Sequence, residues 1–588
     1  MYVTISGTGK YRVIQFVEQY RIPNTRKKTT KVIETVGNYE KMLAENPNII
    51  QELKEEAKRR TEEKKKGKQP ISLSCPLQQI TSVDDSLPSF SFGHAVLEKI
   101  WQDLKLSSFF EKYLPCRKQQ RLIAAMKGLV FHRIMDPTSV LSSQKELSSY
   151  AGFQSDYLDL YYEALDAFKD CQEALIDHLC RQFEAKTGRK GPVAYYDVTT
   201  YAFESVRAGE LRLFGFSKDH KNSEVQVVMG LLIDEQGMPI SYTLFPGNTM
   251  DQTTLETAIA DLQKRYRMEK LVVVADRGLN SKDNLYYLCQ QGHDFVMSYS
   301  LKKAPRELQE LVFDPAGWTI SHDEQGEMVG KQKRLTHILQ ARRLLTDEER
   351  SALPIKKGRR PMYTTDSIPV AVHLTWQADR ARKDQADRER ILEKVKDDLA
   401  TPGKVRAQAK RGRSQYIEYP ADYQDAELDE ERIAWQAKFD GYYAIITNDM
   451  SISTEEVKKI YGGLWRIEES FRVTKSDLEA RPVFVWTDDH IEGHFAMCFL
   501  ALCFHRYIQY LLRQERKEIS SGRIRQALYD VQVVVQGTYP LVTLSPTHLS
   551  ADLLTIWETT NMQPLYNYMT LSDFKRVTKL DLSVNLMV

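Results

Sequence analysis

The amino-acid sequence predicts an α/β protein in which one mixed sheet, covered by helices, carries a large insertion. Three observations support this fold class. Residues 192–301 change their hydrophobic period in the order strand, strand, strand, helix, strand, helix, strand. Residues 92–186 have a helical period throughout, and residues 301–436 form a charged stretch after which a strand-like pattern resumes at Phe439. A hairpin-linked meander followed by helical crossovers gives a mixed sheet with helices packed against it.

Composition limits the classes of function. The chain has 588 residues, of which 42% are hydrophobic and 28% charged, as is typical of a soluble protein with several domains. Its net charge of +2 means that any binding to nucleic acid must come from local basic patches. None of the 7 cysteines lies in a CxxC pair, which argues against a zinc module and for a reducing compartment. The first residues lack the pattern of a secretory signal, so we expect a cytoplasmic protein.

The N-terminal region, residues 1–70, is predicted to be a β-hairpin followed by a basic helix. Residues 1–40 contain two alternating runs around a turn with Pro23 and Asn24, and residues 41–69 read as a charged helix. The region contains 16 Lys and Arg against 9 Asp and Glu. This charge fits either a solvated helix or an arm that contacts a nucleic-acid backbone, and the sequence leaves both interpretations open.

A linker and a helical region follow. Residues 69–91 contain Pro70, Pro76 and Pro88 among serines and threonines, which is typical of a linker. Residues 85–186 are then a candidate DNA-binding domain. Periodicity alone does not distinguish a helix–turn–helix in this region from a plain helical bundle.

Two aspartates follow buried strands of the predicted sheet. Asp197 lies in the strand-like run YYDVTTYAF, and Asp276 directly follows the apolar run LVVVA. The second run does not alternate, which predicts burial on both faces of the sheet. These two strands are the first and the fourth in chain order, and in a mixed sheet they can be neighbours. We therefore expect the two carboxylates to meet at one edge.

The charged stretch at residues 301–436 is predicted to be an insertion subdomain. It carries two basic clusters, at residues 356–360 and 404–413, which we expect to face DNA. Beyond the resumed core, residues 506–588 are predicted to be a C-terminal helical region.

One apolar run could be mistaken for a membrane span. Residues 495–512 are apolar but are interrupted by His505 and Arg506. We therefore interpret the run as a buried helix, and we expect no membrane partner.

Residues 459–478 are predicted to form one helix of about five turns. Tyr461, Glu468 and Lys475 recur every seventh residue, which is almost two turns, so their side chains should point the same way. Glu469 would be turned away from them by about 100°. Such a stripe is either a solvated helix face or one wall of a site that handles a metal and a phosphate.

Asp197, Asp276 and Glu468 together suggest metal-dependent cleavage of a phosphodiester. That reaction needs an activated oxygen nucleophile and compensation of the charge that builds on the leaving oxygen. Two Mg²⁺ ions about 3.5–4 Å apart supply both, and such hard cations prefer carboxylate oxygens. Because an aspartate at the end of a strand is usually structural, the spacing alone does not decide the question.

A resemblance to known proteins decides the question. It is carried by five segments in this order: YYDVTTYAFES, FGFSKDHKNSEVQVVMGLLIDEQGMPI, FPGNTMDQTTL, VVVADRGLNSKDNL and YGGLWRIEESFRVTKSDLEARPVFV. Together they resemble the DDE transposases of bacterial insertion sequences, in the subgroup with the signature Y-x2-R-x3-E-x6-K. The resemblance implies a ribonuclease-H-like catalytic core at residues 187–300 and 437–505. By position, Asp197, Asp276 and Glu468 match the catalytic, metal-binding triad of the family, which implies two Mg²⁺ or Mn²⁺ ions as cofactors.

The resemblance also implies contacts with DNA. Tyr461 and Lys475 match the tyrosine and the lysine that face the DNA backbone in the family. The arginine of the signature falls on Leu464, so that role is not transferred to this chain. Basic residues near the triad and in a polar loop beside the sheet are further DNA-binding candidates: Arg472, Arg277, Lys218 and His220.

The predicted function is a DNA transposase that cleaves the ends of its mobile element and joins the 3′-hydroxyls to target DNA by two-metal in-line transfer. Its partners would be double-stranded DNA and, because two ends are joined, a second copy of the chain on that DNA. We expect it at the nucleoid in a bacterial cytoplasm. One alternative is a transposase-derived DNA-binding protein that has lost activity. Another is a phosphatase of the haloacid-dehalogenase type, which would require a second acid where this chain has Thr199.

Overall fold

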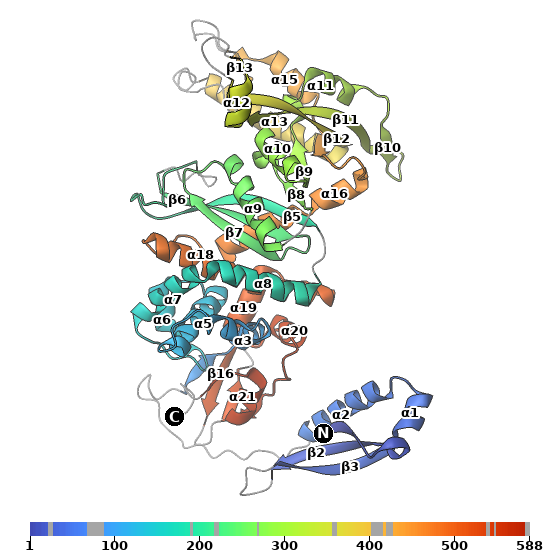
Figure 1. The fold of residues 1–588 in the computed structure, drawn as a ribbon, viewed down its shortest axis with the longest axis vertical. Coiled ribbons are helices and arrows are strands. Elements are labelled where there is room, and N and C mark those ends of the chain that lie inside the picture. The colour runs from blue at the N-terminus through green and yellow to red at the C-terminus, as the bar shows by residue number, and fades with distance from the viewer. Residues whose placement is uncertain are drawn as a thin grey trace. The chain divides into compact units, whose positions relative to one another are not determined.

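The structure is a computed structural model that describes residues 1–21, 28–66, 87–188, 192–216, 223–266, 270–354, 361–400, 415–418, 427–536, 541–545 and 548–582. The chain forms two compact units, Met1–Gln79 and Ile80–Val588. Each unit is described by itself (Figure 1).

The first unit is a three-stranded antiparallel sheet with two helices. Its strands are adjacent in chain order, and its elements are β1 (Tyr2–Ser6), β2 (Val13–Arg21), β3 (Lys28–Asn38), α1 (Tyr39–Glu45) and α2 (Ile49–Lys66). The predicted hairpin is β2–β3, and its turn at residues 23 and 24 lies outside the described residues. The prediction of one charged helix over residues 41–69 is wrong. The helix breaks at residues 46–48 because Pro47 disfavours helical backbone at the residue before it.

The second unit is a mixed α/β structure built around one large sheet. Nine strands occur in the spatial order β10-β11-β12-β15-β9-β8-β5-β6-β7. In that order they are β10 (Thr319–His322), β11 (Met328–Leu344), β12 (Tyr363–Gln377), β15 (Tyr442–Thr447), β9 (Asp294–Tyr299), β8 (Val272–Ala275), β5 (Val193–Ala202), β6 (Gln226–Asp234) and β7 (Pro239–Pro246). This large mixed sheet agrees with the α/β fold class predicted from the sequence.

The strand order predicted for residues 192–301 is confirmed. Strands β5, β6 and β7 form an antiparallel meander, and β8 and β9 run parallel to β5. Helices α9 (Leu255–Tyr266) and α10 (Lys282–Gln290) connect β7 to β8 and β8 to β9. The first and fourth strands are neighbours, as predicted, because β5 pairs with β8. An antiparallel strand, not a crossover helix, follows β5, which disagrees with a phosphatase of the haloacid-dehalogenase type.

Strands of the insertion extend the same sheet. β15 pairs with β12 on one side and with β9 on the other, so hydrogen bonding continues from the core into β10–β12. The remaining elements of this region are α11 (Arg306–Phe313), α12 (Asp347–Ala352), α13 (Ala378–Leu399), β13 (Ile417–Glu418), β14 (Glu427–Leu428) and α15 (Glu430–Ala437). The two predicted basic clusters, residues 356–360 and 404–413, lie outside the described residues.

A helical layer packs against the sheet around the long helix α18 (Asp488–Gln514). In Figure 1, α18 lies between strand β7 and the helices α5 and α7, and it contacts all three. The other helices of the layer are α3 (His94–Asp103), α4 (Leu106–Phe110), α5 (Gln119–Met135), α6 (Val140–Glu146), α7 (Leu158–Asp170) and α8 (Gln172–Thr187). By length and composition α18 could cross a membrane, but 89% of its most apolar window is buried inside the protein. The predicted buried helix is therefore confirmed.

The C-terminal region contains strands that the sequence pattern did not predict. Besides α19 (Ser521–Asp530), α20 (Ala551–Thr559) and α21 (Leu571–Thr578), it has a four-stranded sheet in the order β18-β17-β16-β4. The strands are β18 (Tyr568–Thr570), β17 (Leu541–Leu544), β16 (Gln532–Gln536) and β4 (Ser89–Ser91). β4 belongs to the predicted linker, whose residues 69–86 lie outside the described part of the chain.

The crossing of α7 and α18 depends on one glycine. A Cβ atom at Gly493 would lie 2.1 Å from the carbonyl oxygen of Leu165, a backbone atom that cannot rotate away as the end of a side chain could. We predict that Gly493→Ala destabilises the second unit by about 1–3 kcal/mol, because overpacking a close-packed interior forces backbone shifts.

Thermal unfolding followed by circular dichroism measures this effect. Gly462→Ala is the matched control, since a Cβ there meets nothing within 4 Å and alanine favours a helix over glycine. Equal melting temperatures for the two variants would contradict the packing described for α18.

Candidate active site

Asp197 and Asp276 lie at the same level of two neighbouring strands. The parallel register of β5 and β8 pairs Tyr195 with Val274. Asp197 is two residues beyond Tyr195, and Asp276 is two residues beyond Val274. Continuing the register therefore places the two aspartates opposite each other on strands about 4.8 Å apart. The half-buried Asp197 and the exposed Asp276 form the centre of the candidate site.

Alternate side chains of β5 face the segment that contains Glu468. The Tyr195 hydroxyl donates a hydrogen bond to the backbone oxygen of Ile460 at 2.9 Å. Six residues along the strand, the Tyr201 hydroxyl lies 2.6 Å from the Thr474 hydroxyl. Because every second side chain of a strand points to the same face, Asp197 also faces this segment, between the two anchor points.

The segment facing β5 is not the single helix that was predicted. It consists of α16 (Thr454–Gly462), α17 (Trp465–Arg472) and one π-helical turn, Val473–Asp477. A Cβ at Gly463 would lie 2.0 Å from the Tyr195 hydroxyl, so a glycine is required where the segment approaches β5. The helix is interrupted there, and Lys475 lies within the π-helical turn, which has a different number of residues per turn. The predicted stripe at every seventh residue is therefore not one continuous helix face.

The two adjacent glutamates of α17 have different surroundings. Glu469 accepts a hydrogen bond from the guanidinium of Arg506 at 2.9 Å, and the Arg506 side chain is only 2% exposed. Arg472 lies 3.6 Å from the other oxygen of Glu469. Glu468 is exposed and has no hydrogen bond or ion pair within the described part of the chain. Glu469 is thus the counterion of a buried arginine, and Glu468 is available to a ligand.

Two hydroxyl groups orient the Asp276 carboxylate. Ser298 on β9 donates to its Oδ1 at 3.2 Å, and the Tyr461 hydroxyl on α16 donates to the same oxygen at 3.4 Å. Burial and a hydrogen bond with Tyr443 raise the pKa of Tyr461, so the phenol stays protonated and remains a donor. Three separate elements therefore meet at Asp276.

Sequence reasoning overlooked Ser298, although a signal for it exists. β8 and β9 are parallel and pair Ala275 with Met297, so the next pair in register is Asp276 with Ser298. Once β8 and β9 are assigned as parallel neighbours, the same counting that pairs the aspartates also finds this serine. Tyr443, whose ring centroid lies 5.8 Å from that of Tyr461, could not be found in this way because β15 joins the sheet from beyond the insertion.

The predicted DNA-binding residues are distributed as follows. The Lys475 ammonium group lies 5.6 Å from the centre of the Tyr201 ring, on the face of β5 that Asp197 shares. Leu464 is only 7% exposed, so an apolar side chain occupies the signature's arginine position. Lys218, His220 and the side chain of Arg277 lie outside the described residues.

The donor set fits divalent metal ions. Carboxylate oxygens are the ligands that Mg²⁺ prefers in proteins. The ligand atoms of Asp197, Asp276 and Glu468 do not all lie within 4.8 Å of one another, as ligands of one ion would. Any ion held here would therefore bind only some of the three carboxylates directly.

Comparison with known proteins gives one family. Residues 195–504, more than half of the chain, match the transposase DDE domain. Among solved structures, the chain is similar to a piggyBac transposase in a synaptic complex with hairpin DNA, with 10% sequence identity and a TM-score of 0.32, covering 84% of each chain. No curated protein matches the sequence.

The different roles of the two glutamates lead to a stability prediction. Glu469→Ala leaves the buried Arg506 without its counterion and should destabilise the second unit by about 3 kcal/mol. Glu468→Ala removes an exposed carboxylate without a partner and should change stability by less than about 0.5 kcal/mol.

Urea unfolding of the two variants beside the unaltered chain measures the difference. If Glu468→Ala proved the more destabilising of the two, the assignment of the structural and the available glutamate would be reversed.

Proposed function

The chain belongs to the DDE transposase family, and we propose that it cleaves DNA at the ends of its own mobile element and joins the freed 3′-hydroxyls to target DNA. Membership of this family implies DNA transposition by a metal-dependent enzyme that cleaves and transfers DNA strands. The observation that supports the proposal is the parallel register of β5 and β8, which, continued by two residues, brings Asp197 and Asp276 to one level, with Asp197 facing the segment with Glu468. We propose these three residues as the catalytic triad of a ribonuclease-H-like core.

Asp197, Asp276 and Glu468 would hold two Mg²⁺ or Mn²⁺ ions. When bound, such ions activate an oxygen nucleophile and stabilise the charge on the leaving oxygen. The protein's share of the work is to fix the carboxylates. The Ser298 and Tyr461 hydroxyls hold Asp276 in one orientation, and the hydrogen-bonded anchors at Tyr195 and Tyr201 hold the Glu468 segment against β5.

Other residues near the triad would position the DNA. Lys475 and the exposed Arg472 offer cationic donors to phosphate oxygens from the same segment as Glu468. The Tyr461 phenol, which remains protonated, can contact the backbone only if it exchanges its long hydrogen bond to Asp276. Arg277, Lys218 and His220 remain proposed DNA contacts on sequence grounds.

The reaction implies an assembly. Two element ends must be joined, so we propose a homodimer on double-stranded DNA, at the nucleoid of a bacterial cytoplasm. The motif signature supports the proposal that this activity is that of an insertion-sequence transposase, with Leu464 as a departure from the signature arginine.

We predict that Asp197→Asn, Asp276→Asn and Glu468→Gln each reduce Mg²⁺-dependent nicking by about a thousandfold or more. The metals supply several kcal/mol of transition-state stabilisation, and each 1.36 kcal/mol is about tenfold in rate. The substrate is a plasmid that carries the DNA flanking the gene, and removal of Mg²⁺ with EDTA should have the same effect as the substitutions.

Glu455→Gln, at an exposed glutamate of α16, is the matched control and should cleave normally. Binding to the flanking DNA, measured by gel shift, should be retained by all variants. Full cleavage by Glu468→Gln would overturn the triad. Binding of the flanking DNA without any cleavage by the unaltered chain would instead favour the inactive, transposase-derived DNA-binding protein.

A further inference from the structure

A second group of potential metal ligands lies in the helical layer, outside the matched transposase domain. His132 is on the last turn of α5, Asp136 follows that helix, and Glu146 ends α6. One ligand atom from each of the three residues lies within 4.8 Å of the others. Among the residues that the structure describes, these are the only three His, Cys, Asp or Glu residues whose ligand atoms lie this close together.

The geometry of this group suits a single ion. His132 Nε2 lies 3.0 Å from Glu146 Oε2. Zinc–nitrogen and zinc–oxygen distances are about 2.0–2.2 Å, so two adjacent ligands lie about 3.4 Å apart at a tetrahedral angle and about 3.0 Å apart at a right angle. The separation of the imidazole and the carboxylate is therefore close to that of two adjacent ligands.

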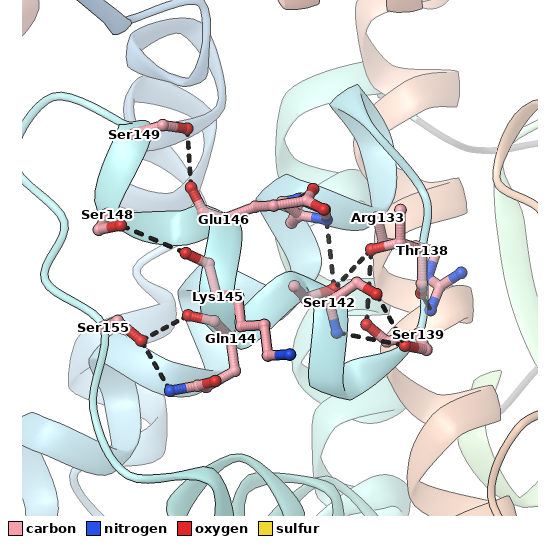
Figure 2. A network of polar contacts seen from close by, with 12 residues as sticks. Arg133, Thr138, Ser139, Ser142, Gln144, Lys145, Glu146, Ser148, Ser149 and Ser155 are labelled. Carbon is pink, nitrogen blue, oxygen red and sulfur yellow. Dashed lines mark hydrogen bonds and ion pairs between the residues drawn. The ribbon is translucent and has the colours of Figure 1, made fainter. Parts of the chain in front are cut away.

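Contacts on the side of Nδ1 and on the ring face fix the orientation of the His132 imidazole. Its Nδ1 lies 3.2 Å from the hydroxyl of the buried Ser143, which lies 3.3 Å from the Thr138 hydroxyl. The ring also stacks on Tyr150, with centroids 5.6 Å apart. Figure 2 shows the hydroxyl network that joins Thr138 and the start of α6 beside Glu146. A hydrogen-bonded second nitrogen is the usual support of a metal-binding histidine, because it fixes both the ring orientation and the tautomer.

The charges around the group favour a cation. Neither Asp136 nor Glu146 pairs with a lysine or an arginine within the described part of the chain. Arg133, although adjacent to His132, donates instead to the backbone oxygens of Thr138 and Glu479. Two carboxylates therefore share one site without a permanent cation between them.

A cation between the three groups would provide the imidazole and both carboxylates with a shared partner.

We propose that His132, Asp136 and Glu146 bind one divalent transition-metal ion. A mixed set of imidazole nitrogen and carboxylate oxygen favours Zn²⁺ or Mn²⁺ over Mg²⁺, which prefers oxygen ligands. The ion would tie the end of α5 to the end of α6. It would also steady the turn that carries Arg133, whose contact with the Glu479 oxygen adjoins the segment of Lys475. This site is independent of the proposed catalysis, because none of its ligands belongs to the triad.

Zinc titration of the full-length chain tests the proposal. The background variant carries Asp197→Asn, Asp276→Asn and Glu468→Gln, so that the proposed catalytic ligands do not contribute. Metal is first removed with EDTA and dialysis. Isothermal titration calorimetry with ZnCl₂ at pH 7 should then show one stoichiometric Zn²⁺ site that depends on His132, Asp136 and Glu146. Adding Asp136→Asn or Glu146→Gln should weaken that site at least about tenfold, the lower limit for losing even a supporting residue.

Asp159→Asn, at an exposed carboxylate of α7, is the matched control and should bind like the background variant. Circular dichroism verifies that each variant is folded. Asp136→Asn and Glu146→Gln both keep the shape of the side chain and leave the buried His132 unchanged. Absence of stoichiometric Zn²⁺ binding, or equal binding by Glu146→Gln and the background variant, would overturn the proposal. Neither outcome depends on DNA or on activity, so failure here is distinct from failure of the proposed transposase function.

Discussion

The pairing of β5 with β8 is the constraint on which the rest of the second unit depends. Only a parallel pair in this register puts Asp197 and Asp276 at one level. Val273 and Val274 of β8 are fully buried, so both faces of the sheet must be covered at this point. The crossovers contribute the helices α9 and α10, and the segment with Glu468 covers the face of β5 that bears Asp197. The position of the aspartates thus follows from hydrogen bonding and apolar burial, before any ligand is considered.

The same strand then positions the third carboxylate. Tyr195 and Tyr201 fix the two ends of the facing segment, and Arg506 holds its middle through Glu469. A buried guanidinium without a counterion is costly, so one of the two adjacent glutamates must turn inward. Its neighbour, Glu468, is thereby left on the outer side of the helix. The interior electrostatics of α18 and α17 therefore determine which glutamate is available to a ligand.

Much of this arrangement could be predicted because it is local. The change of hydrophobic period predicted the meander and the crossovers and allowed β5 and β8 to be neighbours, and the position of Asp197 and Asp276 at strand ends singled them out as candidates. The failures have non-local causes. The helix break at Gly463 results from the approach of Tyr195, which lies far away in the sequence. Strands β16–β18 pair with one another and with β4, and no periodicity near Ser89 indicates a partner near Gln532. The domain boundaries proposed from the sequence remain predictions.

The central claim is that Asp197 and Asp276 act as metal ligands in DNA cleavage. Replacing their hard carboxylate ligands by softer thiolates tests it most directly. Each aspartate is replaced in turn by cysteine, and nicking of the flanking-DNA plasmid is measured with Mg²⁺ and with Mn²⁺. A thiolate is a poor ligand for Mg²⁺ and a better one for the softer Mn²⁺. The account predicts no cleavage by either variant with Mg²⁺ and recovered cleavage with Mn²⁺. Cleavage by both variants with Mg²⁺ at the rate of the unaltered chain would contradict it.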